Sequence, residues 1–320
     1  MVLFKIFIYI KRKIWYNVEK INKRGKMKKD KLLKSSIVII LISLIITIFI
    51  SEKYKLDKAV FLKSYCEYPI NYSSDNEYSN YQFTIKYITN INDKKKVNNI
   101  EFDNIPQVNY SYASEGIDNW MYTGQYENGE NEEICGLYSV RYVNVHLSLY
   151  FDEKPLDNIV INKARVYFTD GTQQEINLGE IIFYYEDNMD TSIDFNNTSR
   201  KSNGKFDAYG SVLKDITVTK IYSPLFKYSK EYLNLNLNEV SYKEINSKEY
   251  KAGSTIYYEG KFDASESIED LYTTFEVVPK IYYINDKGEK WYKRCRYIYY
   301  DAHNFSFRYI LKYLKAMGEI

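Results

Sequence analysis

The sequence predicts a mainly β protein with one N-terminal transmembrane helix, one or two antiparallel β-sandwich units of the immunoglobulin-like (Ig-like) kind, and a C-terminal helix. Three observations predict this. An apolar run extends from Ile37 to Ile50. From Gln82 onward, short runs of alternating apolar and polar residues recur between turn-forming residues. The last segment, residues 304–317, has apolar side chains at helical spacing and contains Leu, Lys, Ala and Met, which favour a helix over the strand that its alternating aromatic residues also allow.

The apolar run is typical of a membrane anchor that is retained. Only Ser43 and Thr47 interrupt it, and both can hydrogen-bond to the helix backbone; the uncharged stretch covers residues 35–51, near the lower limit for a spanning helix. The following residues contain no A-x-A-like cleavage site. We therefore expect contact with the lipid bilayer through Ile37–Ile50. A cleaved signal peptide and a buried core helix are the alternatives.

The charge distribution predicts the orientation of this anchor. Residues 1–34 carry 12 basic and two acidic side chains, a net charge of +10, so the rest of the chain carries −8 within a total of +2. Basic residues flank the cytoplasmic end of a membrane helix. We expect a cytoplasmic N-terminus and an extracellular C-terminal domain. A domain at −8 is poorly suited to nucleic acid, because affinity there depends on neutralising phosphates.

Residues 1–26 have two interpretations. Met27 begins a segment, MKKDKLLK, that looks like a short export leader, so the preceding residues can be an extended start. Alternatively they form a basic, aromatic arm on the membrane surface, with Phe4, Phe7 and Trp15 at the interface.

The most regular strand pattern extends from Leu137 to Phe151. Its odd-numbered positions are apolar from Val143 onward, which predicts a core-facing side, while Asn144, His146 and Ser148 fall on the other side. Asp170-Gly171 lies between two apolar runs and predicts a hairpin with a type I′ turn. The predicted organisation is a basic arm (1–34), an anchor (35–51), a stalk or linker (52–80), one sandwich (81–226), a second sandwich (227–303) and a helix (304–320).

Composition argues against an aromatic binding surface. The chain has 36 tyrosines, and Tyr, Ile, Asn and Lys are enriched together. Codons rich in A and T favour all four residues, so we attribute the tyrosines to nucleotide composition rather than to sugar binding.

Catalytic motifs are missing from the sequence. His146 and His303 are the two histidines, and neither accompanies a G-x-S-x-G motif. Cys66, Cys135 and Cys295 include no C-x-x-C pair; a Cys135–Cys295 disulfide and three free thiols both remain open. We therefore expect no enzyme, no cofactor and no catalytic residues.

Acidic loops supply weak calcium candidates. Asp187, Asp190 and Asp194 lie in an Asn-rich segment, and residues 127–133 form a second acidic run, but neither matches the spacing of an EF-hand. Solvated hairpin tips explain both equally simply. Facing carboxylates of a glycosidase remain an alternative.

Basic residues recur near the C-terminus among aromatic residues. They are Lys290, Lys293, Arg294, Arg296, Arg308, Lys312 and Lys315. Gathered on one surface, they would suit an anionic polymer or the membrane; scattered, they are solvated charges.

The leading functional hypothesis is a membrane-anchored extracytoplasmic protein with a non-catalytic binding or interaction role. A protein or a cell-envelope polymer is the expected partner. The alternatives are an accessory subunit of a membrane complex, which predicts a large exposed apolar patch, and a cell-surface polymer hydrolase with paired carboxylates. Exposed aromatic residues in a row, without a carboxylate pair, would favour binding over hydrolysis.

Overall fold

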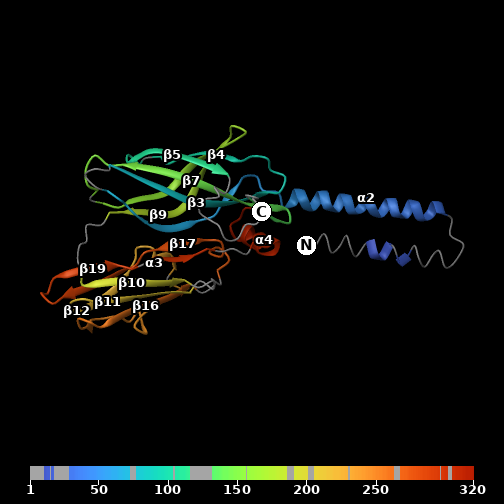
Figure 1. Cartoon of the computed structure of the whole chain (residues 1–320). Helices are drawn as coiled ribbons and strands as arrows, with labels where there is room; N and C mark the ends of the chain where they lie inside the picture. Colours follow the sequence, from blue (N-terminus) through green and yellow to red (C-terminus); the bar gives the residue numbers. More distant parts are fainter. Residues whose placement is uncertain are drawn as a thin grey trace.

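The fold is mainly β, as predicted, with an N-terminal apolar helix and a C-terminal helix (Figure 1). The structure is a computed structural model. It describes residues 11–14, 16–17, 29–72, 77–103, 105–115, 132–155, 157–185, 191–200, 205–229, 231–262, 267–295, 297–301 and 305–320.

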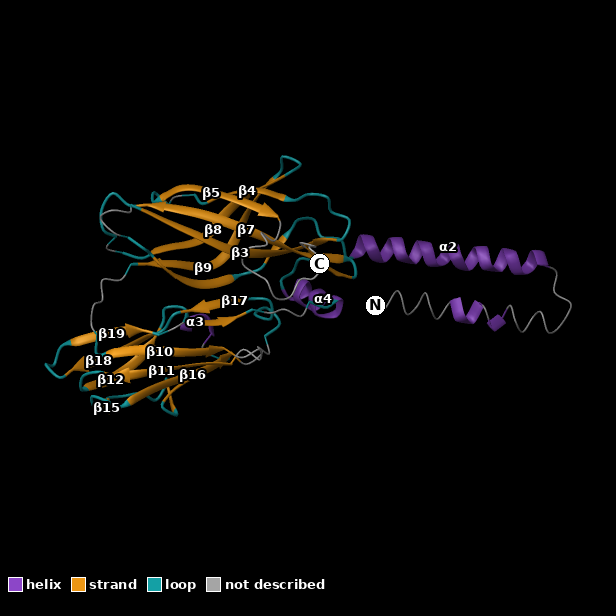
Figure 2. Cartoon of the chain, in the orientation of Figure 1, coloured by secondary structure: helices purple, strands orange, loops and turns teal. Residues whose placement is uncertain are grey.

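Helix α2 (Lys29–Lys53) projects from the β-strands as a separate rod (Figure 2). Its segment Lys34–Lys53 has a mean hydropathy of 2.4 and is long and apolar enough to cross a membrane. None of that segment is covered by the rest of the chain. The Ser43 hydroxyl donates to the Ile40 carbonyl at 3.0 Å and the Thr47 hydroxyl to the Ser43 carbonyl at 2.8 Å, so the two polar side chains are satisfied within the helix.

Two sheets form the first sandwich. The outer sheet has the order β1 (Val60–Phe61), β3 (Tyr78–Asn90), β7 (Tyr138–Tyr150), β5 (Val108–Glu115), with β6 (Glu132–Cys135) also paired to β7. The inner sheet has the order β20 (Ile298–Tyr300), β17 (Thr274–Val277), β2 (Ser64–Pro69), β9 (Gln173–Tyr184), β8 (Ile159–Phe168), β4 (Val97–Glu101). Val143, Val145, Leu147 and Leu149 of β7 fill the core between them, as their odd-numbered spacing predicted.

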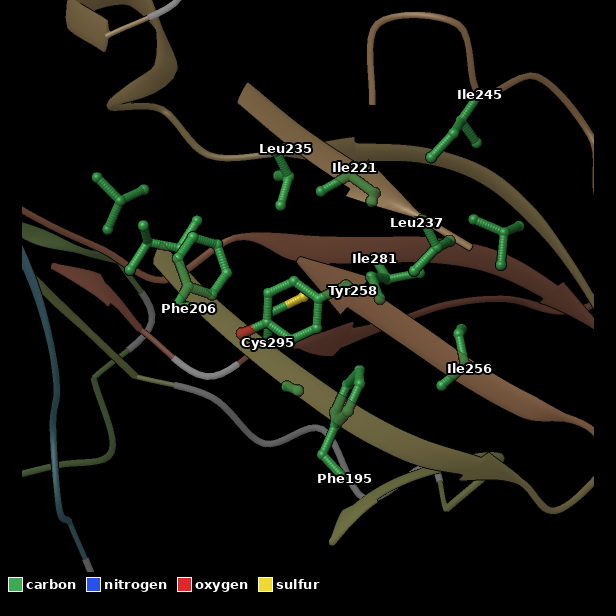
Figure 3. Close-up of a cluster of buried hydrophobic side chains, with 14 of the residues drawn as sticks. Phe195, Phe206, Ile221, Leu235, Leu237, Ile245, Ile256, Tyr258, Ile281 and Cys295 are labelled. Carbon is green, nitrogen blue, oxygen red and sulfur yellow. The ribbon is translucent and has the colours of Figure 1, made fainter. Parts of the chain in front are cut away.

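The second sandwich has its own core. One sheet has the order β10 (Ile193–Arg200), β11 (Lys205–Val212), β16 (Thr255–Phe262), β13 (Leu233–Leu237), β14 (Val240–Ser241). The other has the order β15 (Lys248–Tyr250), β12 (Ile216–Tyr222), β18 (Lys280–Asn285), β19 (Lys290–Arg294). Short helix α3 (Phe226–Ser229) also contributes to this core. Figure 3 shows the packing of Phe206, Leu235 and Tyr258 with their neighbours.

The change from one core to the other comes earlier in the chain than the predicted boundary at residue 226. Strands β10, β11 and β12 all pack in the second core. They alternate as regularly as the preceding strands, so sequence periodicity gives no sign of the change. Sheet pairing between segments distant in sequence decides it: β11 pairs with β16, and β12 pairs with β18.

The predicted stalk at 52–80 also differs from the structure, because its middle is strand β2. This strand pairs in parallel with both β9 and β17 and joins the two sandwiches. Cys66 faces the first core, whereas Tyr65 faces the second. A strand that is covered on both faces lacks the alternation of apolar and polar residues that marks a half-exposed strand. Glu67 also made the segment look polar, so the sequence did not predict a strand here. Gly179 of β9 permits the close approach of β2, since a Cβ there would lie 2.5 Å from the Ser64 carbonyl oxygen.

A third, smaller core lies beside the end of α2. The predicted C-terminal helix is present as α4 (Phe307–Ala316), which buries Ile310, Tyr313 and Leu314. The three cysteines are free and buried, and each lies in a different core, which explains why no pair forms. Burial raises the pKa of Cys135 to about 11, so this thiol stays protonated at neutral pH.

The predicted hairpin at Asp170-Gly171 is present between β8 and β9, with a different turn. Only Gly171 has a positive φ, of 82°, whereas a type I′ turn needs positive φ at both central residues. The Gly171 amide donates to the Phe168 carbonyl at 3.0 Å. This matches a three-residue loop that ends in a left-handed glycine.

Candidate functional site

The outer surface of β3, β7 and β5 carries rows of uncharged polar and aromatic side chains. We call it the tyrosine face. Alternation directs every second residue outward, and antiparallel pairing places the rows in register: Gln82, His146 and Tyr112 are aligned, as are Asn80, Ser148 and Tyr110. The face consists of Tyr78, Asn80, Gln82, Thr84, Tyr110, Tyr112, Ser114, Asn144, His146, Ser148 and Tyr150, with no Asp, Glu, Lys or Arg among them; Ser148 is buried between its neighbours.

Ring contacts hold the tyrosines of this face in place. Tyr112 stacks on His146 with centroids 4.3 Å apart and planes within 3°, and the Tyr110 ring lies 6.4 Å from Tyr112 with planes within 8°. Tyr110 and Tyr112 nevertheless remain 50% and 44% exposed. Tyr78 and Tyr150 form a second ring pair at 5.0 Å. Large aromatic surfaces are thus presented to solvent in ordered orientations, which lowers the entropic cost of binding.

The tyrosine face lies on the half of the outer sheet that is remote from α2. Leu56, just after α2, donates its backbone N–H to the Asn90 side chain at 2.9 Å, which fixes the end of β3 beside the helix. Tyr78 lies at the other end of β3. At about 3.3 Å per residue, that is roughly 40 Å farther away. The Tyr78–Tyr150 end of the face is therefore the end remote from α2.

A hollow of about 590 Å³ adjoins this remote end. Tyr150 contributes to both surfaces. The lining includes Pro106, Pro155 and the carboxylates of Asp152, Glu153 and Asp157. Hydrogen bonding to Asp152 raises the pKa of Tyr150 to about 12, so its hydroxyl is a neutral group at physiological pH. All three carboxylates are exposed. General acids in glycosidases depend on an apolar, buried environment, which these positions lack.

Of the three aspartates considered as calcium ligands, the structure describes one, Asp194. Asp187 and Asp190 lie outside the described residues, as do residues 127–131. Asp194 is an exposed residue of strand β10, opposite Ser211, and not of a bent loop. In the part of the chain that the structure describes, no group of three or more His, Cys, Asp or Glu side chains could hold a metal ion.

The two histidines have separate outcomes. His146 lies on the outward side of β7, as predicted, and stacks with Tyr112. His303 lies outside the described residues.

The C-terminal basic residues do not form one surface. Lys290, Lys293 and Arg294 belong to β19, whereas Arg308, Lys312 and Lys315 belong to α4, near the opposite end of the molecule (Figure 1). Arg296 lies outside the described residues. The bases of β19 instead share a sheet with lysines from β12 and β18, which the sequence did not group with them.

Comparison with known proteins gives only distant structural likenesses. No protein-family model matches the chain, and no curated protein sequence matches it. Among solved structures, the D00-D0 domain of intimin is 11% identical, with 76% of this chain and 99% of that one covered and a TM-score of 0.22. Fibronectin(III)-like modules of Clostridium thermocellum CbhA are 8% identical, with 78% and 96% covered and a TM-score of 0.18. The E. coli chaperone DraB is 10% identical, with 75% and 98% covered and a TM-score of 0.20. Such low scores identify no ligand.

Proposed function

We propose that this chain is a membrane-anchored extracytoplasmic protein that binds a neutral saccharide chain without catalysis, through the tyrosine face. The observation that carries the proposal is the row of exposed, ordered rings on an uncharged sheet surface. The C–H groups of a sugar ring pack on aromatic faces, while its hydroxyls exchange hydrogen bonds with neutral amide, hydroxyl and imidazole groups. Asn80 and Gln82 supply amides in the same rows as Tyr110 and Tyr112, on the other side of β7, and Asn144 of β7 supplies a third.

Charge and apolarity favour a saccharide over a protein partner. The cores of protein interfaces are enriched in Met and Arg as well as in aromatic residues. The tyrosine face shares the aromatic residues but contains no aliphatic side chain, no Met and no Arg among its members. A binding role is also favoured over hydrolysis, because the carboxylates of the adjoining hollow are exposed. Nucleotide composition explains the number of tyrosines, yet it does not explain their register on one face.

The membrane part of the proposal is supported by α2 and the charges before it. The large apolar side chains of α2 from Ile37 to Phe49 are exposed, and burial in lipid would remove that surface from water. With residues 1–34 at +10, the positive-inside rule places the N-terminus in the cytoplasm. The sandwiches and the tyrosine face then lie outside the cell.

Protease treatment of intact cells tests this topology. With a C-terminal tag, we expect the tag to be removed while an N-terminal fragment containing α2 stays with the membrane. Lysed cells treated in the same way are the control for accessibility. A tag that is protected in intact cells and cleaved after lysis would contradict the proposed orientation.

Replacing Tyr112 by alanine is expected to weaken saccharide binding at least tenfold, since a central aromatic contact is typically worth roughly 2 kcal/mol. The full chain in detergent micelles or nanodiscs is screened on an array of neutral glycans. The dissociation constant for a bound glycan is then measured for wild type and variant. Tyr112→Phe keeps the ring and should retain most of the affinity.

Tyr209→Ala is the matched control for Tyr112→Ala. Tyr209 is 47% exposed and packs against the Tyr257 ring at 4.5 Å, but it lies on the outer surface of the second sandwich. Its replacement should leave binding unchanged. If no neutral glycan is retained on the array, or if Tyr112→Ala binds as wild type does, the proposed ligand is wrong.

A further inference from the structure

A second exposed surface, on the other sandwich, combines lysines with tyrosines. It is the outer surface of β12, β18 and β19, and we call it the basic face. Strand pairing places Lys220 opposite Tyr282, which in turn lies opposite Tyr292. In the next row, Tyr222 lies opposite Lys280, which lies opposite Arg294. The row on the other side pairs Ile284 with Lys290. Cationic and aromatic residues therefore alternate across and along the strands.

The lysines of the basic face are held over aromatic rings. The Lys220 ammonium lies 4.6 Å from the centroid of Tyr282 and 5.5 Å from that of Tyr222. The Lys280 ammonium lies 3.8 Å from the centroid of Tyr292. These cation–π contacts restrict flexible side chains without removing their charge. Lys220 and Lys280 are diagonal neighbours on adjacent strands, roughly 7–8 Å apart at the backbone.

In the strand register, no acidic residue lies opposite the two central lysines of the basic face, Lys220 and Lys280. Glu67 is buried beneath one end and attracts both Lys280 and Arg294, so one carboxylate faces two cations there. Glu249 of the edge strand β15 lies in the same row as Lys290, at the opposite edge of the sheet, and Asp286 and Glu289 lie in the turn before Lys290. The positive charge of the face is therefore concentrated in the rows of Lys220 and Lys280. A positive surface on a domain of net charge −8 is a local feature, and it attracts an anionic ligand.

The position of the basic face selects between anionic ligands. Figure 1 draws β12 and β19 at the end of the molecule opposite to α2, so the lipid headgroups around α2 are out of reach. The face is a sheet surface with cations in successive rows, which matches an extended chain with repeated charges. Tyrosine hydroxyls between the cations can donate hydrogen bonds to phosphate oxygens.

We propose that the basic face binds a linear phosphate-bearing polymer outside the cell. This site is separate from the tyrosine face, lies on the other sandwich, and depends on different residues. Two ligands of different chemistry, one neutral and one anionic, would then be held by one anchored chain.

Inorganic polyphosphate is the probe for this proposal. We expect the full chain in detergent micelles to bind it, and the Lys220→Gln/Lys280→Gln variant to bind at least tenfold more weakly. The slope of the logarithm of the binding constant against the logarithm of salt concentration should become less steep by about 1–2. The reason is that fewer phosphate contacts release fewer counterions on binding. The Lys220→Arg/Lys280→Arg variant keeps both charges and should retain the binding.

The matched control is Lys205→Gln/Lys261→Gln, which removes the same charge from the outer surface of β11 and β16. It should leave polyphosphate binding within about twofold of wild type, since exposed charges beyond a Debye length are largely screened. Equal weakening in both double variants would mean non-specific attraction and would overturn the proposal. So would an absence of polyphosphate binding, or binding only to phosphatidylglycerol vesicles, which would assign the face to a membrane surface.

Discussion

Replacing Lys86 by methionine is expected to lower the free energy of unfolding by about 3–5 kcal/mol. Lys86 of β3 forms an ion pair with Asp301, which follows β20, and both side chains are only 7% exposed. Thr274 and Tyr299 donate hydrogen bonds to the same carboxylate at 3.1 and 3.2 Å. Methionine leaves Asp301 buried beside β3 without the ammonium, and desolvation of that charge is then poorly compensated.

Urea unfolding of the full chain in detergent, followed by circular dichroism, measures this effect. The double variant Lys86→Met/Asp301→Leu should recover most of the loss, because replacing both members of a buried pair by apolar residues removes the desolvation cost. Lys95→Met is the control: Lys95 pairs with Asp170 at 3.0 Å but is exposed, so little change is expected. A single variant as stable as wild type would contradict the importance of this pair.

Replacing Glu67 by alanine should also destabilise the protein by about 3–5 kcal/mol. Glu67 is 2% exposed on β2, the strand between the two cores. Its carboxylate accepts hydrogen bonds from the Val278 amide at 2.7 Å and the Ser223 hydroxyl at 2.9 Å, and lies 3.8 Å from Arg294. Alanine leaves these buried groups without that acceptor. Glu67→Gln keeps a side-chain oxygen for the Val278 amide and should lose less than half as much.

The pH dependence of Glu67→Gln gives a second measurement. Burial raises the pKa of Glu67 in the folded protein, so the protonated form is favoured by folding. The resulting stability is fully present below the pKa of an unfolded glutamate, about 4.3, and is lost as pH rises through the folded pKa. Wild type should therefore gain stability relative to Glu67→Gln as pH falls. A difference that is constant with pH, or a glutamine variant as unstable as alanine, would contradict this account.

Local patterns in the sequence predicted much of the first sandwich. The alternation from Val143 to Leu149 identified the buried side of β7, and it placed Asn144, His146 and Ser148 on the opposite side. Asp170-Gly171 located a hairpin, although glycine alone adopts the positive φ. The apolar spacing of residues 307–314 identified α4. Each of these features depends on neighbours within one strand, turn or helix.

The candidate binding surfaces could not be predicted in the same way. Tyr110 and Tyr112 join His146 only because β5 pairs with β7 in one register, and a shift of one residue would turn both rings into the core. Lys220 and Lys280 are 60 positions apart in the sequence and meet because β12 pairs with β18. The sequence contained the signal of alternation at Tyr110 and Tyr112, but not the partner strand.

The sequence by itself determined the apolar helix, the charge contrast on its two sides and the mainly β character of the remainder, because hydrophobicity, charge and side-chain period are local properties of the chain. Only the tertiary structure decided that β2 lies between two cores, that β10 to β12 belong to the second sandwich, and which side chains share an exposed face. Those features depend on pairing between strands that are distant in the sequence. The free energy that favours this pairing comes from burying sheet faces against one another, and no single segment of the sequence specifies which faces meet.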